Sequence, residues 1–123
     1  MAKTLRVVYF KTDGSYPKWM DVKDDIHTFH ELIHCDTIDI PRRYIDGKSY
    51  RIICDDCGLL KLNPKISVYS MKSVQFPIVG NVLVAGMEDN EGELTDLTDE
   101  DITRITCRKH TVLVDGRWVL MVD

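Results

Sequence analysis

Two short pairs of metal-binding side chains are the residues whose types and spacing point most directly to chemistry. Cys54 and Cys57 are separated by two residues, and Cys107 and His110 have the same spacing. Structural Zn²⁺ is held tetrahedrally by four Cys or His ligands, and a Cys-x2-Cys spacing lets both sulfurs reach one ion from a tight turn. Gly58 follows the second Cys, where a residue without Cβ lets the backbone curl toward the sulfurs. The sequence therefore predicts one structural Zn²⁺ bound by Cys54, Cys57, Cys107 and His110.

Histidines of an expected helix form a second group of metal-binding side chains. His27, His30 and His34 recur at positions i, i+3 and i+7, which lie on one face of a helix, and Cys35 follows directly. Histidines on a polar helix face are usually solvated, so the two spaced pairs are the preferred set. One alternative stays open, in which His30, His34 or Cys35 replaces a member of that set.

Motifs that support catalysis do not occur in the chain. It has no Gly-x-Ser-x-Gly, no phosphate-binding Gly-rich loop and no His-Glu-x-x-His. Cys54 and Cys57 lack the βαβ context of a thioredoxin-like redox pair. A zinc ion with four protein ligands leaves no open position for water or substrate. We therefore expect a protein that is not an enzyme.

One segment carries the acidity of the chain. Residues 88–101 contain eight Asp or Glu and no Lys or Arg, whereas the net charge of the whole chain is −4. The segment does not fit a calcium-binding loop, because placing Gly92 at the sixth position puts Met87 first and Thr98 twelfth, where carboxylates are needed. Either these side chains are solvated or they bind a basic groove on a partner. The second interpretation predicts partner contacts by Glu88, Asp89, Glu91, Glu93 and Asp96.

Length and composition are those of one globular domain. Of the 123 residues 44% are hydrophobic, so residues 1–123 are expected to fold as a single compact domain. The chain has no stretch of about 18 apolar residues and no apolar run after a basic start, which predicts a soluble, unexported protein of the host cytoplasm. In that reducing compartment the four Cys are expected as thiols or metal ligands. The acidic net charge disfavours a general nucleic-acid binder.

The N-terminal third has local signals for strands and a helix. Residues 5–10 are rich in β-forming side chains, and residues 19–22 are a candidate return strand. Residues 24–35 have apolar side chains at helical spacing, and Asp24 or Asp25 can cap the first turn.

Two Asp-Gly pairs predict hairpins, because both central residues of a type I′ turn need a positive φ. The first, at 46–47, joins strands at 38–45 and 48–54, and the second, at 115–116, joins strands at 112–114 and 118–122. Pro41 cannot donate to a strand ladder, so its strand is expected at a sheet edge.

The remaining elements complete the expected fold. Residues 76–84 are an apolar run that predicts one buried strand around Gly80, and residues 59–75 are ambiguous. Thr98 and the three acids after it predict a second helix that reaches Cys107. Together these elements predict an α+β domain with a small, mostly antiparallel sheet and two helices, stapled by one structural zinc.

Several short motifs occur in an order that resembles a known group of proteins. They are residues 29–33 (FHELI), 50–55 (YRIICD) with 58–61 (GLLK), 77–81 (PIVGN), and 91–93 (EGE) followed by 97–102 (LTDEDI). This order is similar to that of a family of small uncharacterised proteins carried by phages and mobile elements. A small phage-type protein with a zinc staple and an acidic surface also resembles, in kind, the zinc-containing anti-CRISPR proteins that inhibit Cas9.

The resemblance implies a counter-defence protein that binds a Cas9 effector stoichiometrically and blocks its binding or cleavage of target DNA. The acidic segment is then expected to face a channel that otherwise holds nucleic-acid phosphate. Two alternatives remain open. One is a sponge that sequesters a nucleotide defence signal in a pocket lined by Arg42, Arg51 or Arg104, and the other is a zinc-stabilised transcriptional or accessory module. Neither a membrane nor sequence-specific binding of nucleic acid is expected.

Overall fold

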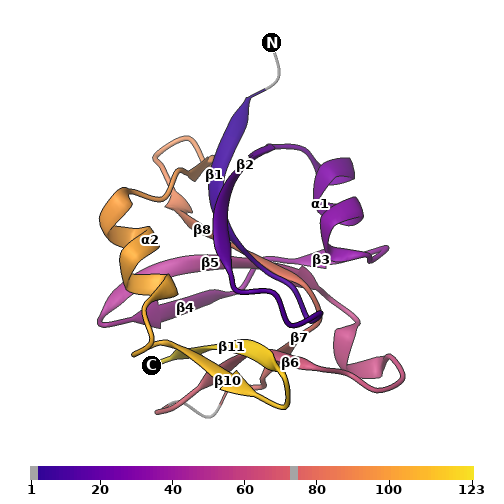
Figure 1. Ribbon diagram of the computed structural model, residues 1–123. Helices are drawn as coiled ribbons and strands as arrows, with labels where there is room; N and C mark the ends of the chain where they lie inside the picture. The colour runs from indigo at the N-terminus through magenta and orange to yellow at the C-terminus, as the bar shows by residue number, and fades with distance from the viewer. Residues whose placement is uncertain (1–2, 73–74) are drawn as a thin grey trace.

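Two antiparallel-rich sheets and two α-helices form three layers in the computed structural model, which describes residues 3–72 and 75–123 (Figure 1). The larger sheet is the central layer. Helix α1 (Ile26–Ile33) packs on one of its faces. The smaller sheet and helix α2 (Asp99–Thr106) cover the other face. The predicted α+β class with two helices and mostly antiparallel pairing is therefore confirmed.

The larger sheet has seven strands, all paired antiparallel. Its members are β1 (Thr4–Phe10), β2 (Lys18–Lys23), β3 (Ile38–Asp39), β4 (Arg42–Ile45), β5 (Lys48–Asp55), β8 (Val82–Glu88) and β9 (Leu94–Thr95). The main path runs in the order β2-β1-β8-β5-β3, while β4 also pairs with β5 and β9 pairs with β8. Strands β5 and β8 are thus the central members, and every candidate site described below lies beside them or at their ends.

The smaller sheet has four strands in the order β10-β11-β6-β7. They are β6 (Ile66–Ser70), β7 (Ile78–Val79), β10 (Thr111–Val114) and β11 (Arg117–Val122). Only the pair of β11 and β6 is parallel. The sequence predicted one sheet, and the structure has two, because the C-terminal hairpin of β10 and β11 pairs with β6 and not with a strand of the larger sheet.

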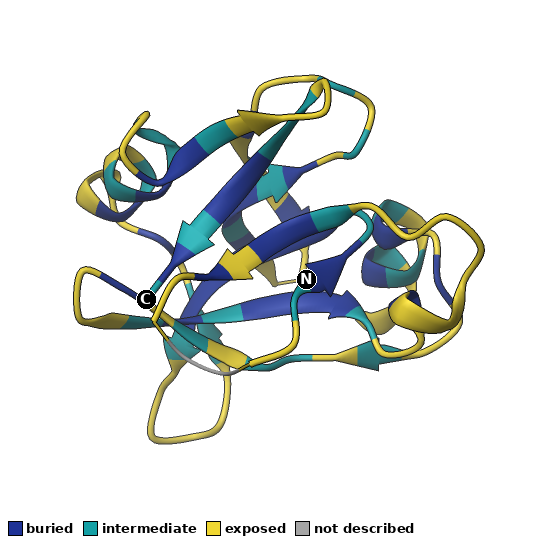
Figure 2. Ribbon diagram, turned by 90° about the horizontal axis from the view of Figure 1, so that it is seen from below, coloured by how far each residue is buried: buried dark blue, intermediate teal, exposed yellow. Residues whose placement is uncertain are grey.

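Alternation along β5 separates the two cores (Figure 2). Tyr50, Ile52 and Cys54 are buried toward α2 and the smaller sheet. Ile53 points to the opposite face and packs with Phe29 of α1. Successive side chains of a strand point to opposite faces, so a central strand covered on both sides is apolar without interruption. Cys54 lies on the side of this alternation that faces the smaller sheet, so its thiol is buried.

Local signals for the helices are confirmed. The carboxylate of Asp25 accepts a hydrogen bond from the Thr28 N–H at 2.8 Å, and α1 ends at His34, which has a φ of 60°. The Thr98 hydroxyl and the Asp101 carboxylate form a capping box at the start of α2. These side chains satisfy N–H groups that have no partner inside the helix.

Both Asp-Gly hairpins are also confirmed. Asp46 and Gly47 have φ values of 52° and 79° between β4 and β5, and the second pair has values of 49° and 78° between β10 and β11. Two consecutive positive φ angles match the right-handed twist of the flanking strands. The first hairpin turn brings Asp46 next to the end of α2.

The predicted strand at residues 76–84 is wrong in one respect, because the structure divides it between the two sheets. β7 belongs to the smaller sheet and β8 to the larger one, and Gly80 between them has a φ of 83°. An apolar run cannot reveal such a break, since both halves are buried. The ambiguous stretch 59–75 contains strand β6, and a single 3₁₀ turn, η1 (Gly58–Leu60), overlaps its start; residues 73–74 lie outside the described part. No helix in the described part is long and apolar enough to cross a membrane.

Candidate functional site

The two predicted pairs of zinc ligands lie toward opposite ends of β5. Cys54 is near the end of the strand and Cys57 follows in the next turn, whereas the imidazole of His110 lies 3.3 Å from Asp46, before the strand starts. Six residue steps from Lys48 to Cys54 span roughly 20 Å. Zinc ligands must approach to about 2.0–2.3 Å.

The four-ligand zinc site therefore does not assemble in this structure. Among the described residues, which include Cys54, Cys57, Cys107 and His110, no three His, Cys, Asp or Glu side chains are grouped so that they could hold a metal ion. The ligand types and spacings suited zinc, but the length of β5 keeps the pairs apart.

Cys54 is a core residue. Its side chain is 4% exposed, and its thiol donates a hydrogen bond to the Asp39 carbonyl at 3.5 Å. Burial raises the pKa of this thiol to about 12, and the neighbouring Asp39 carboxylate adds to the effect. Cys57 is exposed, and its sulfur accepts a hydrogen bond from the Thr37 hydroxyl at 3.6 Å. The two thiols of the Cys-x2-Cys motif are therefore in different environments.

The alternative ligands of α1 do not form a metal site either. His34 ends the helix, and its carbonyl accepts a hydrogen bond from Lys61. Cys35 is buried in the core beneath α1, and burial raises the pKa of its thiol. His30 is in the last turn of the helix. None of the three belongs to a metal-binding group in the described part of the chain.

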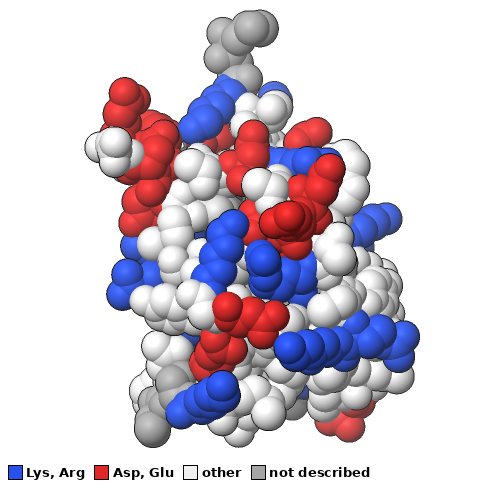
Figure 3. All heavy atoms as spheres, turned by 90° about the vertical axis from the view of Figure 1, so that its left-hand side faces the viewer, with Lys and Arg blue, Asp and Glu red and all other residues white. Residues whose placement is uncertain are grey.

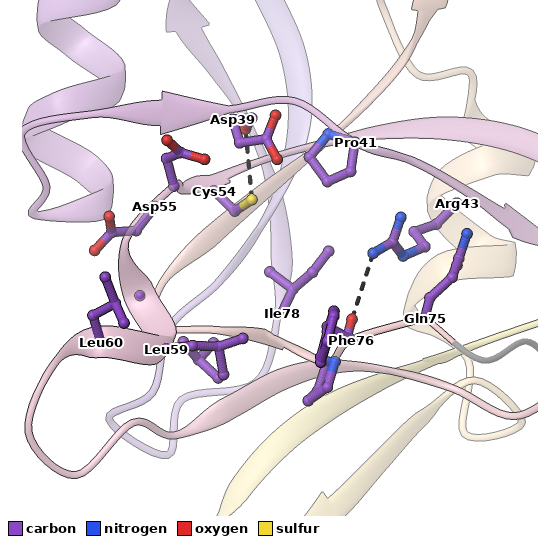
Figure 4. A pocket seen from close by; sticks show the side chains of 14 residues that line it. Asp39, Pro41, Arg43, Cys54, Asp55, Leu59, Leu60, Gln75, Phe76 and Ile78 are labelled. Carbon is purple, nitrogen blue, oxygen red and sulfur yellow. Dashed lines mark hydrogen bonds between the residues drawn. The ribbon is translucent and has the colours of Figure 1, made fainter.

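A groove of about 390 Å³ lies beside Cys54 (Figure 4). Its walls include Leu59 and Leu60 of η1 on one side and Phe76 on the other. Leu60 is 86% exposed and Phe76 is 81% exposed. Arg43 reaches across the groove and donates a hydrogen bond to the Phe76 carbonyl at 3.5 Å. Contiguous exposed apolar side chains of this kind are typical of protein-binding surfaces.

At the other end of β5, a thiol, an imidazole and a carboxylate lie in a row. The sulfur of Cys107 is 3.5 Å from Nδ1 of His110, and Nε2 of the same ring is 3.3 Å from Oδ1 of Asp46. Nδ1 is also 2.8 Å from the Arg104 carbonyl oxygen. These side chains line an open groove of about 470 Å³. Asp46 was not predicted as a site residue. It is 64 residues from His110 in the sequence and was noted only as part of the hairpin turn.

A buried carboxylate anchors α2 beside this row. Asp101 is 3% exposed and accepts hydrogen bonds from Lys48 and Tyr50, both at 2.6 Å, and from Arg104 at 3.1 Å. Burial opposes ionisation of Asp101, but these hydrogen bonds and those of the Thr98 cap hold the pKa of its carboxyl below the usual range. The charged network fixes α2 against β5 and thereby positions Cys107.

Three of the five predicted partner contacts hold the acidic segment together. Glu88 forms an ion pair with Arg51 at 2.5 Å, and the hydrogen bond from that guanidinium lowers the pKa of Glu88 to about 2. Asp89 accepts hydrogen bonds from the backbone of Glu91 and Glu93 in the turn between β8 and β9. Asp96 accepts one from the Arg6 N–H at 2.8 Å. Glu88, Asp89 and Asp96 therefore have structural partners within the chain.

Four other carboxylates remain directed to solvent, and we call them the acidic face: Glu91, Glu93, Asp99 and Glu100. Two of them also form ion pairs within the chain, Glu93 with Lys3 at 3.6 Å and Asp99 with Arg6 at 3.0 Å, but their side chains stay 57% and 90% exposed. Figure 3 views the side that carries α2, where Asp and Glu side chains gather over the upper part with Lys and Arg side chains between them. Glu91 and Glu93 were predicted by name as partner contacts, whereas Asp99 and Glu100 were included only as members of the acidic segment 88–101 and of the helix start.

The arginines of the alternative anion pocket have separate partners. Arg51 is paired with Glu88, Arg104 contacts Tyr50 and Asp101, and Arg42 lies over the ring of Tyr44. Arg42 and Arg51 are cross-strand neighbours that both lie near Glu88, and Arg104 is held by Asp101, so all three guanidinium groups already have partners within the chain.

Comparison with known proteins gives one match. No curated protein and no solved structure matches the chain. The family model described as "Domain of unknown function (DUF3846)" matches residues 5–110, from the start of β1 to the histidine beside Cys107. Because the match covers most of the 123 residues, the chain belongs to the DUF3846 family.

Proposed function

We propose that the protein is a phage-type counter-defence protein that binds a nucleic-acid-processing effector stoichiometrically, with Cas9 as the specific target. The observation that carries this proposal is the acidic face. Its four carboxylates are exposed on the β8–β9 turn and the first turn of α2. Clustered carboxylates are attracted by a basic nucleic-acid channel in the same way as phosphates.

The acids that have partners within the chain support the same proposal. Asp89 and Asp96 hold the turn and the segment after it in place, and Glu88 ties β8 to β5 through Arg51. A surface that is already ordered before binding loses less conformational entropy in the complex. The acidic face is thus pre-arranged, unlike a free acidic tail.

A protein partner is favoured over a nucleotide. The groove beside Cys54 exposes Leu60 and Phe76, whereas the arginines considered for an anion pocket are occupied by Glu88, Asp101 and Tyr44. Exposed apolar side chains contribute to protein interfaces and add nothing to the binding of phosphate.

The test is cleavage of matched DNA by Cas9 and its guide in the presence of increasing amounts of the purified protein. We expect loss of cleavage near an equimolar ratio and weaker inhibition at higher salt. The variant E91Q/E93Q/D99N/E100Q removes the four charges of the acidic face and should inhibit at least about tenfold less strongly.

A matched control removes the same number of exposed charges elsewhere. The variant D21N/E31Q/D36N/D115N changes four exposed acids with the same change in net charge, and it should inhibit like the unmodified protein. Equal loss of inhibition in both variants would mean that only net charge matters. Undiminished cleavage with a tenfold excess of the unmodified protein, across several Cas9 types, would rule out Cas9 as the target.

A further inference from the structure

The row of Cys107, His110 and Asp46 has the arrangement of a thiol with a base and an orienting carboxylate. Cys107 is the C-terminal cap of α2, His110 follows in the next turn, and Asp46 comes from the β4–β5 hairpin. The imidazole is held on both sides, with 9% of its side chain exposed. A nucleophile near a base that a third group orients is the general pattern of an activated side chain.

The surroundings of His110 favour acceptance of a proton from Cys107. The Arg104 carbonyl accepts a hydrogen bond from the Cys107 thiol at 3.3 Å and lies 2.8 Å from Nδ1, while Nε2 lies 3.3 Å from the Asp46 carboxylate. A neutral imidazole has one N–H for these two acceptors, the carbonyl and the carboxylate. Transfer of the Cys107 proton to the ring therefore lets both ring nitrogens donate, and it leaves the sulfur 3.5 Å from Nδ1–H.

Access distinguishes this thiol from the other three. Cys107 is partly exposed on the wall of an open groove, together with Thr103 and Lys109. Cys35 and Cys54 are buried. Cys57 is exposed, but the side chain that contacts its sulfur is the hydroxyl of Thr37, which is not a base.

Backbone hydrogen bonds near Cys107 disfavour one class of reaction. The N–H groups of Cys107, His110 and Thr111 all donate to backbone carbonyls, so none of the three is available to stabilise an oxyanion. Acyl transfer depends on such donors. Attack on a disulfide forms no oxyanion and needs only an accessible sulfur and a place for its proton. Side chains of both charges, Glu100 and Lys109, line the groove and suit a zwitterionic peptide disulfide.

We infer that Cys107 is the nucleophile of a thiol–disulfide exchange site whose substrate is a small peptide disulfide. The Cys107 sulfur attacks one sulfur of the substrate while its proton passes to Nδ1 of His110. The substrate S–S bond breaks, a mixed disulfide forms at Cys107, and the leaving thiolate takes the proton. The Cys107 sulfur is oxidised by as much as the leaving sulfur is reduced, and the other substrate sulfur stays in a disulfide, so no further oxidant is required. Asp46 is a positioning residue.

The experiment uses glutathione disulfide as the probe and mass spectrometry of peptides to follow the mixed disulfide at each cysteine. We expect Cys107 to react at least about tenfold faster than Cys57 in the same chain, since a positioned base contributes about a hundredfold or more at full efficiency. His110→Gln should reduce the rate at Cys107 to near that of Cys57. His30→Gln, on α1, is the matched control and should change neither rate.

Substitutions of Asp46 separate positioning from folding. Asp46 has a positive φ, which Asn and Gly tolerate. Asp46→Asn keeps an acceptor for Nε2–H and should preserve most of the rate, whereas Asp46→Gly should lose severalfold. Urea unfolding of each variant confirms that the fold persists.

Three results would overturn the inference. They are a rate at Cys107 that does not exceed the rate at Cys57, a rate unchanged in a folded His110→Gln variant, and rapid reaction with iodoacetamide without any reaction with glutathione disulfide. The last result would retain a nucleophilic thiol but reject a disulfide as its substrate.

Discussion

The two ends of β5 surround their cysteines with opposite chemistry. At one end, Cys54 points into the core, is 4% exposed and has a pKa raised to about 12 by burial. At the other end, Cys107 lies on the wall of a groove, 3.5 Å from an imidazole that also contacts Asp46. Thiol chemistry depends on exposure and on neighbouring bases. The same residue type therefore stabilises the core at one end and is available for reaction at the other.

The charged network makes the second end rigid as well as polar. Lys48, Tyr50 and Arg104 all contact the buried carboxylate of Asp101. At the groove end, Lys61 forms an ion pair with the buried Asp55 carboxylate at 2.5 Å, but the Cys54 sulfur itself makes a weak hydrogen bond to the Asp39 carbonyl. We therefore expect substitutions to have different consequences at the two ends.

The largest expected effect is at Asp101. Asp101→Ala removes the buried carboxylate that accepts hydrogen bonds from Lys48, Tyr50 and the Thr98 N–H, so the free energy of unfolding should fall by about 2–4 kcal/mol. Urea unfolding measures this change in the free energy of unfolding. Asp99→Ala, two residues earlier in the same helix turn, removes a 90% exposed carboxylate and should change stability little. Similar losses in both variants would contradict a special role for the buried network.

The second effect is a loss of stability in alkali. Burial raises the pKa of Cys54 to about 12 from an ordinary value of 9.0, so above pH 9 the unfolded chain releases a proton that the folded protein retains. The protonated Cys54 thiol therefore makes its full contribution to the free energy of unfolding below pH 9, and this contribution is lost as the pH rises toward 12. By pH 11 the free energy of unfolding should fall by about 2–3 kcal/mol.

Cys54→Ala tests this assignment in urea titrations between pH 8 and pH 11. Its stability should decline less steeply than that of the unmodified protein. A residual decline is expected, because burial also raises the pKa of the Cys35 thiol and of the Tyr50 hydroxyl. Parallel curves for both proteins would show that the Cys54 thiol does not titrate in this way.

The third effect compares one substitution at both ends. Cys54→Ser places a more polar group in the core and should lower the free energy of unfolding by about 1–2 kcal/mol. Cys107→Ser changes a partly exposed residue and should have a smaller effect. Thermal melting of the two variants under identical conditions measures the difference. An equal or larger loss for Cys107→Ser would reverse the comparison.

The smallest expected effect is that of a chelator, and it tests the predicted zinc site directly. Because β5 separates the two ligand pairs, we expect the melting temperature of the purified protein to be the same with and without a zinc chelator. Metal analysis provides the second measurement. One equivalent of zinc that both Cys54→Ser and Cys107→Ser remove would show that a single ion joins the two ends after all.

Signals that act over a few residues predicted most of the fold. Asp25 and Thr98 start the two helices, and the two Asp-Gly pairs form hairpins, as expected. The break at Gly80 was not predicted, because an apolar run looks the same whether it continues in one buried strand or passes between two sheets.

The candidate sites were less predictable. Glu88 looks like Glu91 in the sequence, yet one is paired with Arg51 across the sheet and the other is exposed. The choice depends on β5 lying beside β8, which no local pattern reveals. For the same reason Asp46 was noted only as a turn residue, although it contacts His110 in the structure.

By itself, the sequence determined the helix caps, the hairpin turns and the presence of two Cys-containing pairs, because these depend on residue type and short spacing. Tertiary structure alone decided which side chains meet. The alternation of β5 directs Cys54 into the core, and the length of that strand separates it from His110. Pairing between strands brings Asp46 beside α2. Contacts across the fold arise from the shared burial of distant segments, and their partners are therefore set by packing rather than by spacing along the chain.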